Sequence, residues 1–397
     1  MSLPRARIPR TARPAPQCLA PAVREITAAC ACVAAGLLST TLARPALADC
    51  LPNPPGDGQT VTCTGPAPSS VPLDASAASG VTVNVNADAV ISGSGTLMLL
   101  GNGAQLNNLG RIESVAPASG EGSAAVVAFG AGSTLRNFGT LTTAGPNALS
   151  FVSVGNDVEL RNEAGASITI TGDLAAGLLA SGTEGNRLVN AGLITLSNYQ
   201  GAGMFVQESN RATLTNTASG VIVSSGDLAF GMAAFGGSGH ALRNDGSIET
   251  RGLASHGMLL NEATASSLIN GGSITTLGGS SETVNRAFGM FSAGGQGNSL
   301  QNLAGGTITA SGIGSSAIEV DGSTDSLLRN EGTLNVSGTG AHGLYVLSGA
   351  RNTLDNRGDI NTSGQRGNGM RADDGDSSFL NSGSILVGGR DAFGVYM

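Results

Sequence analysis

Gly375-Asp376-Ser377-Ser378 and three histidines are the residues of this sequence that could support nucleophilic catalysis. A hydrolytic triad needs a serine hydroxyl, a histidine base and a carboxylate that orients the base. Runs of Gly, Asp and Ser also mark loops. His256 and His342 stand where other copies of a repeat have phenylalanine, and His240 lies within the same repeat. We interpret all three as packing or corner residues, and we predict no catalytic residues and no enzyme activity.

Asp373, Asp374 and Asp376, beside Arg371, form the densest cluster of acidic residues. Carboxylates with a basic neighbour suit glycoside chemistry, and clustered carboxylates can bind calcium. We expect no second cluster at the same register on adjacent repeats, and the nonapeptide calcium-binding repeat is absent. The chain has no lysine, which a phosphate-binding loop requires. We therefore interpret the cluster as solvated loop acids and predict no metal site and no cofactor.

Arg357-Gly358-Asp359 is an Arg-Gly-Asp tripeptide, the motif that integrins recognise, and is a candidate adhesion motif. Gly358 is a fixed position of the repeat, whereas its two neighbours are positions where charged residues appear in other copies. The interpretation that we favour is two solvated corner residues.

The elements that position these residues follow from one repeat, Leu-x-Asn-x-Gly-x-Ile, which recurs about every 25 to 30 residues. Residues 242–248 show the frame without insertion. Three copies carry an extra residue or two before the last apolar position, and the last copy begins with Phe379. The asparagines of the frame are Asn108, Asn137, Asn162, Asn190, Asn216, Asn244, Asn270, Asn302, Asn330, Asn356 and Asn381.

Fixed apolar positions beside freely varying polar ones are typical of strands that bury one face. Asn and Gly between the apolar anchors indicate a tight, left-handed corner. Further apolar runs, such as residues 229–232 and 287–290, fall about half a period away. This pattern predicts an all-β fold: a single-stranded, right-handed parallel β-helix (solenoid) of about 11–13 coils.

Stacked coils would bring the repeated asparagines into a column with a spacing of about 4.8 Å. Inside the solenoid they would form an amide ladder, in which each side chain satisfies the hydrogen bonds of its neighbours. The alternative is that these asparagines are exposed turn formers. The architecture is the same in both cases.

Composition excludes some classes of function. The chain has 61 glycines among 397 residues, but 40% of its residues are apolar and they recur periodically, which excludes disorder. Residues 49–397 contain 14 Arg against 27 acidic residues, a balance of −13. Such a surface repels phosphate backbones, so we predict no nucleic-acid partner. The same charge discourages association between rods, and we expect a monomer.

Residues 1–48 have the order of an export signal: an Arg-rich start, an apolar run at 26–42, and a small-x-small site that ends at Ala48. We predict cleavage between Ala48 and Asp49. A retained membrane anchor is the alternative, but the apolar run is shorter than a membrane span needs. We reject a lipoprotein signal at Cys50, because Asp49 stands where that processing needs a small residue.

Cys50 and Cys63 are an even pair in a chain predicted to be exported, so we expect a disulfide worth roughly 3 kcal/mol. We place it in an N-terminal cap at residues 49–66, followed by the β-helix at 67–397. The repeat runs unbroken to Met397. We expect it to be truncated there, in a fragment or a shortened gene product.

The export leader, the Cys50 and Cys63 pair and the tandem Asn-x-Gly-x-Ile coils resemble the passenger region of a bacterial autotransporter (type V secretion). The resemblance covers nearly the whole chain from residue 49. It implies an outer-membrane barrel, which we do not find in this chain because no series of long amphipathic strands with aromatic girdles is present.

What the resemblance implies for function is a surface-exposed, outer-membrane or extracellular protein that acts as a structural stalk or adhesion module. The chain would be periplasmic if the barrel is truly missing. Its host or cell-surface ligand is not identified by the sequence. The alternative is a β-helical polysaccharide-active enzyme, a lyase or hydrolase, for which an acid-rich groove with arginine beside it would be the distinguishing feature.

Overall fold

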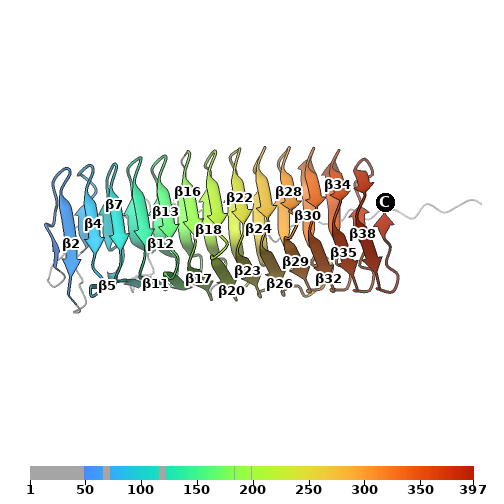
Figure 1. The fold of residues 1–397 in the computed structure, drawn as a ribbon, viewed down its shortest axis with the longest axis horizontal. Helices are drawn as coiled ribbons and strands as arrows, with labels where there is room; N and C mark the ends of the chain where they lie inside the picture. Colours follow the sequence, from blue (N-terminus) through green and yellow to red (C-terminus); the bar gives the residue numbers. More distant parts are fainter. Residues whose placement is uncertain (1–48, 66–71, 116–121, 183, 198) are drawn as a thin grey trace, which may run out of the picture.

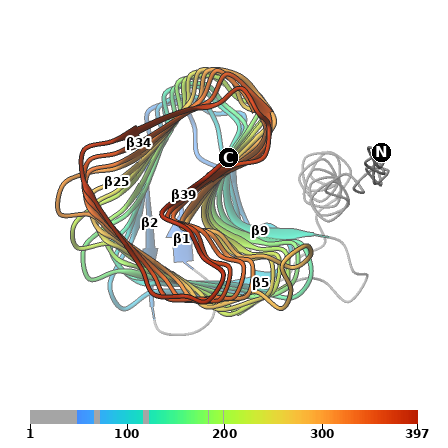
Figure 2. The same ribbon diagram turned by 90° about the vertical axis from the view of Figure 1, so that its right-hand side faces the viewer.

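The computed structural model describes residues 49–65, 72–115, 122–182, 184–197 and 199–397. The predicted export signal, with Ala48, lies outside these residues. Every element named in the described residues is a β-strand, and the strands stack into a rod (Figure 1). Along the axis of the rod, the strands of successive coils nearly superimpose (Figure 2). In the part of the chain described, no helix is long and apolar enough to cross a membrane.

Sheet A contains the Leu-x-Asn part of each frame. Its 14 strands, in order along the rod, are β1 (Asp49–Leu51), β2 (Thr60–Thr64), β4 (Thr82–Val85), β7 (Gln105–Asn108), β10 (Thr134–Asn137), β13 (Glu159–Asn162), β16 (Arg187–Asn190), β19 (Thr213–Asn216), β22 (Ala241–Asn244), β25 (Ser267–Asn270), β28 (Ser299–Asn302), β31 (Leu327–Asn330), β34 (Thr353–Asn356) and β37 (Ser378–Asn381). Leu242 pairs with Leu268, and Asn244 with Asn270, so each frame residue meets its counterpart in the next coil.

Sheet B follows the glycine of each frame and turns the last apolar residue of the frame inward. Its 12 strands are β5 (Val90–Ser94), β8 (Arg111–Val115), β11 (Thr140–Ala144), β14 (Ser167–Thr171), β17 (Leu193–Leu196), β20 (Val221–Ser224), β23 (Ser247–Thr250), β26 (Ser273–Thr276), β29 (Thr307–Ala310), β32 (Thr333–Val336), β35 (Asp359–Thr362) and β38 (Ser384–Val387). Ile248 pairs with Ile222 and Ile274 of the neighbouring coils. Buried and partly exposed residues alternate along β23, as expected of a sheet with one face in solvent.

Sheet C is formed by the apolar runs that lie half a period from the frames. Its 13 strands are β3 (Leu73–Ala75), β6 (Met98–Leu100), β9 (Ser123–Ala128), β12 (Ala148–Ser153), β15 (Ala176–Ser181), β18 (Ala202–Gln207), β21 (Phe230–Phe235), β24 (His256–Asn261), β27 (Met290–Ala293), β30 (Ile318–Thr324), β33 (Leu344–Ala350), β36 (Met370–Ala372) and β39 (Val395–Tyr396). In β9, β12, β18, β21 and β24 every residue is buried. Both faces of this sheet are therefore covered.

The prediction of an all-β parallel solenoid is confirmed, with sheets of 12 to 14 strands that give about twelve turns. The main apolar core fills the tube and contains the Leu and Ile of the frames together with inward residues of sheet C such as Met232 and Ala234. A second apolar cluster lies on the other face of sheet C and contains Phe230, Ala233 and Phe235.

The frame asparagines form a continuous ladder inside the tube. Nδ2 of Asn244 donates to Oδ1 of Asn270 at 2.8 Å, and Nδ2 of Asn270 donates to Oδ1 of Asn302 at 2.8 Å. The second hydrogen of each amide reaches backbone carbonyl oxygens; for Asn244 these include the oxygen of Ser273 at 3.1 Å. The ten asparagines from Asn108 to Asn356 are completely buried, so they are not exposed turn formers. Asn381, at the end of the ladder, is exposed.

The prediction that Asn and Gly of the frame form a left-handed corner is wrong for the frames without insertion. In two of the longer copies, Gly165 and Gly305 do have a positive φ, of 83° and 86°. Neither Asn244 nor Gly246 has a positive φ. A Cβ atom on Gly246 would lie 2.2 Å from the carbonyl oxygen of Gly220. Glycine is needed there because the backbones of adjacent coils approach too closely for a side chain. Left-handed residues occupy the corners on either side of sheet C instead, as in Leu228 and Arg211, with φ of 53° and 52°.

The first described strand closes one end of sheet A. β1 runs antiparallel to β2, with Cys50 opposite Cys63, and a disulfide joins these two residues. Both cysteines are buried within the main core. Asp49 is the first residue of β1. The cross-link therefore fixes the strand that covers the edge of the first coil.

Replacement of Asn270 by Ala is expected to destabilise the rod by roughly 2–5 kcal/mol, because Asn244 loses an acceptor and Asn302 loses a donor inside the core. The matched control is Asn361→Ala, on the outer face of sheet B, where Asn361 donates to Asn335 at 3.1 Å. It should cost less than about 1 kcal/mol. Thermal unfolding measures both variants. Equal losses would contradict a stabilising role for the ladder.

Candidate functional site

One column of residues on the outer face of sheet C changes its chemistry along the rod. From β9 to β27 the column is apolar and ends with Leu259 and Phe291. The next residues in register are Glu319, Tyr345, Arg371 and Tyr396. In place of the second apolar cluster, the rod therefore carries a charged and aromatic group of side chains, which we call the charged face.

Glu319 is the buried acid in the column of the charged face. Its side chain is completely buried, and Nη1 of Arg286 lies 2.7 Å from Oε1 of Glu319. Ser316 and Arg286 both favour its carboxylate form, although neither oxygen of Glu319 receives a hydrogen bond of strict geometry. Burial, opposed by Arg286, raises the pKa of Glu319 to about 7. Asp321, two residues along the same strand, is also buried, and its Oδ2 has no donor.

Arg371 links the two aromatic residues of the charged face. Its guanidinium group lies 5.2 Å from the ring centroid of Tyr345 and 5.3 Å from that of Tyr396. Its Nε and Nη2 donate to Asp373 at 2.8 and 2.9 Å. The hydroxyl of Tyr345 donates to the same carboxylate at 2.9 Å, and burial raises the pKa of Tyr345. This end of the charged face is rigid and largely neutralised.

The pairing of sheet C is irregular at the same place. Between β30 and β33 the register shifts on either side of Asp321. Ser348 lies opposite Asp321 and donates to its Oδ1 at 2.6 Å. β-bulges re-aim side chains and are frequent next to functional sites. The buried carboxylates, the bulge and the aromatic residues thus lie within four adjacent coils.

The histidines are structural. Nδ1 of His342 accepts the backbone N–H of Asn368 at 3.0 Å, and Nδ1 of His256 accepts that of Phe288 at 3.1 Å. The ring proton is then on Nε2, so the 3.2 Å approach of Arg371 to Nε2 of His342 is not a hydrogen bond. Burial, followed by the charge of a nearby arginine, lowers the pKa of both His256 and His342 to about 3.

His256 is also part of an aromatic stack, between the rings of Phe230 and Phe288 at 5.7 and 5.0 Å. His240 accepts the N–H of Ala212 through Nδ1 at 3.3 Å, and burial lowers its pKa. None of the three rings has the surroundings of a general base.

On the coil before the Asp373 group, Tyr345, and not an acidic residue, lies in register with Arg371. Glu319, the next acid in that register, lies two coils from Arg371. Asp374 and Asp376 instead stabilise a corner: Asp374 accepts from Ser377 at 2.6 Å, and Asp376 accepts the N–H of Arg351 at 3.0 Å. Ser377 therefore bonds a neighbouring acid rather than a histidine.

The sequence profile of one protein family, described as the BigA third pectate lyase-like domain, matches residues 58–265 and again residues 234–397. The two matches overlap and together cover well over half of the chain. The chain belongs to this family. No curated protein and no solved structure matches the chain.

In this BigA-type domain the Arg-Gly-Asp tripeptide lies at the tight turn from sheet A to sheet B. Arg357 forms an ion pair with the buried Asp355 at 3.0 Å. A Cβ atom on Gly358 would lie 2.2 Å from the carbonyl oxygen of Gly332. Asp359 is exposed at the start of β35. The tripeptide is therefore part of the stacked turns and does not project as a loop.

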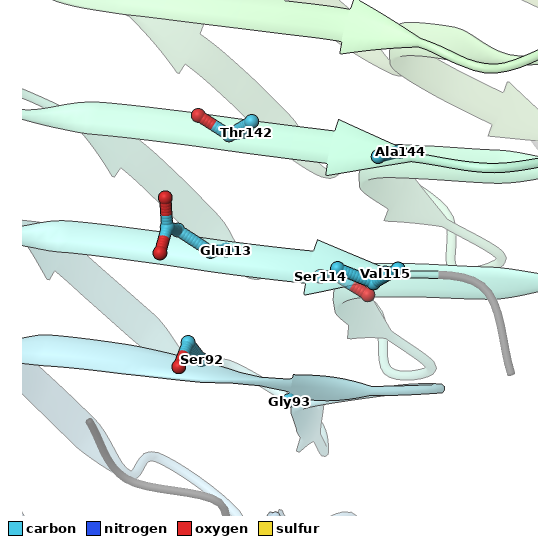
Figure 3. Close-up of a pocket in the computed structure, with 7 residues that line it drawn as sticks. All are labelled: Ser92, Gly93, Glu113, Ser114, Val115, Thr142 and Ala144. Carbon is cyan, nitrogen blue, oxygen red and sulfur yellow. The ribbon is translucent and has the colours of Figure 1, made fainter.

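The domain also has a surface depression of about 340 Å³ on the outer side of β5, β8 and β11 (Figure 3). It is lined by Ser92, Gly93, Glu113, Ser114, Val115, Thr142 and Ala144. Glu113, its ionisable residue, is paired with Arg111. In the described residues, no group of three or more His, Cys, Asp or Glu side chains is placed to hold a metal ion. The charged face is thus the stronger candidate site.

Replacement of His342 by Asn is expected to reduce acid sensitivity. The unfolded histidine binds a proton near pH 6.5, whereas the folded one binds it only near pH 3, so stability is lost as the pH falls between these values. At pH 5 the loss is about 2 kcal/mol. Asn keeps an acceptor, as Asn368 does for Phe393 in the next coil. Denaturation at pH 7 and pH 5 measures the stability that each protein loses between these values. A loss as large in the Asn variant as in the wild type would contradict the prediction. The control variant His342→Leu should be less stable than the wild type at both pH values, because leucine offers no acceptor to the N–H of Asn368.

Replacement of Glu319 by Gln is expected to stabilise the fold at pH 8 by roughly 3 kcal/mol and to have little effect at pH 4.5. The raised pKa contributes stability that is complete below pH 4.5 and is lost as the pH rises through 7. The control Asp355→Asn should destabilise at both values, because Arg329 and Arg357 lose their partner. Urea denaturation measures the free energy of unfolding of each variant. Destabilisation of the Gln variant at pH 8 would contradict a raised pKa for Glu319.

Proposed function

We propose that the chain is the passenger region of an autotransporter-type exported protein and acts as a structural stalk and adhesion module. The observation that supports this most strongly is the unbroken register of Leu, Asn and Ile from coil to coil, in a chain that belongs to the BigA domain family. Each coil contacts chiefly the next one, so the rod can lengthen by adding coils one at a time. A stalk that presents loops at its corners follows from this geometry.

The expected location supports the same proposal. The leader at 1–48 would direct export, with cleavage after Ala48, and the disulfide between Cys50 and Cys63 would form in an oxidising compartment. The acidic balance of residues 49–397 suits a surface that stays soluble and monomeric. The partner would be a ligand on a host or neighbouring cell.

Expression of the full chain in a Gram-negative bacterium tests the export step. The protein should be recovered outside the cytoplasm with Asp49 as its first residue and with Cys50 joined to Cys63, as shown by mass spectrometry without reduction. The variant Ala48→Arg should block cleavage, because the peptidase needs a small residue there. An uncleaved chain with free thiols in the cytoplasm would refute the proposal.

A second candidate function, a polysaccharide-active enzyme, is favoured by one observation. Glu319 and Asp321 project from one face of β30, and the pKa of Glu319 is raised into the range that suits a general acid. Glycoside cleavage uses such a pair, one carboxylic acid and one carboxylate. Against this function, Glu319 is completely buried, so Arg286 and its neighbours would have to move before a sugar chain could reach it.

Incubation of the full chain with polygalacturonate and with xylan tests this second function. A lyase should release unsaturated uronates and a hydrolase should release reducing ends, and Asp321→Asn should abolish either activity. The control Asp376→Asn should retain it, since Asp376 only holds the N–H of Arg351. No product from either polymer would refute this candidate and leave the stalk proposal unaffected.

A further inference from the structure

One corner of the rod carries an insertion. Between β26 and β27 the chain runs from residue 277 to 289, whereas the corresponding corner between β23 and β24 is residues 251–255. We call residues 280–285 of this corner the strap. Among the described corners between sheets B and C, this one departs furthest from the common length.

The strap is held at both ends. Gly279 and Arg286 pair across its base as an antiparallel bridge, and Ser280 pairs with Ile313 of the next coil. Glu282 forms an ion pair with Arg366, which is 84 residues away and three coils further along the rod. Arg286 packs over the ring of Phe288 at 4.8 Å and reaches Glu319. The insertion therefore lies along the rod, with contacts to the coils beside it.

The corners beneath the strap are shaped to receive it. At the left-handed position of this corner, earlier coils have Leu174, Gln200, Leu228 and Ala254, with φ between 52° and 57°. The next two coils have Gly314 and Gly340. A Cβ atom on Gly314 would lie 2.6 Å from the oxygen of Ser281, and one on Gly340 would lie 2.6 Å from Cγ of Glu282. The third coil has Arg366, which binds the tip of the strap.

The earlier coils, which lack the strap, have side chains at this left-handed position. The two glycines are therefore explained by the strap, whose atoms occupy the space that a side chain would need. Loop and corners fit each other over three coils. This fit indicates a fixed docking position for the strap.

A solenoid is close to one-dimensional, because each coil normally contacts only its neighbours and can open almost independently of distant coils. Among the other side-chain hydrogen bonds of the described residues, the largest separation along the sequence is 37 residues. Those bonds join adjacent coils. The pair of Glu282 and Arg366 skips two coils. We propose that the strap is a clamp that couples the coils of β26, β29, β32 and β35, so that this section of the rod opens as one unit.

Amide hydrogen exchange on the full chain, read by mass spectrometry, tests the clamp. Arg366→Glu places two carboxylates together, and it should speed exchange about three- to tenfold in the strap and in the corners at 312–316 and 338–342. The charge-swapped double variant Glu282→Arg/Arg366→Glu should restore the wild-type rates. The proposal would be overturned if Arg366→Glu left the exchange rates of both corners unchanged. It would also be overturned if the double variant did not restore the wild-type rates.

The matched control is Arg351→Glu. Arg351 is similarly exposed, and its ion pair with Asp325 joins adjacent coils at the opposite corner. It should loosen that corner and leave residues 312–316 and 338–342 unchanged. Deletion of residues 280–285 gives a second test: the three coils beside the strap, those of β29, β32 and β35, should exchange faster, while unchanged protection at 134–216 shows that the rod is folded. Wild-type rates in those three coils after the deletion would refute the clamp.

Discussion

A side-chain amide can be buried in an apolar tube only if each of its polar atoms has a partner, and in this protein the partner is the same amide of the next coil. The chain of bonds from Asn108 to Asn381 fixes the register of sheet A, because a shift by one residue would turn the amides toward the outer face, and a shift by two would set them against the frame leucines. The ladder begins at Asn108, because the preceding residue in the column is Val85. The Oδ1 of Asn108 therefore has no donor. Frame glycines such as Gly246 and Gly358 also let the backbones of adjacent coils approach closely.

The architecture could be predicted from the sequence because sheets A and B each bury one face. Leu242 and Ile248 recur at fixed spacing among variable polar residues, and that alternation is visible without a structure. The role of the frame glycine could not be predicted from propensity. Gly246 suits a left-handed turn and a close approach equally well, and only the stacking of Gly220 beneath it distinguishes the two. Some of the left-handed positions are held by residues that carry no turn signature, such as Leu228 and Arg211.

The charged face was hidden from sequence analysis for a related reason. Sheet C is buried on both faces over much of its length, so its strands lack the alternation that would tell inward from outward residues. Glu319, Tyr345 and Arg371 are widely spaced in the chain, and only the register of β30, β33 and β36 brings them side by side. The bulge beside Asp321 adds a shift that no repeat pattern contains. The acids that could be recognised, Asp374 and Asp376, prove to be corner residues.

Two departures from the regular rod coincide, and they share a residue. Arg286 closes the base of the strap and also faces Glu319, the buried acid of the charged face. Replacing an apolar column by partly unsatisfied carboxylates lowers stability, and such departures persist where something else depends on them. The strap adds contacts across the same coils, so it compensates for the apolar packing lost at Glu319 and Asp321. A uniform spacer would need neither feature, and their coincidence marks this section as the specialised part of the rod.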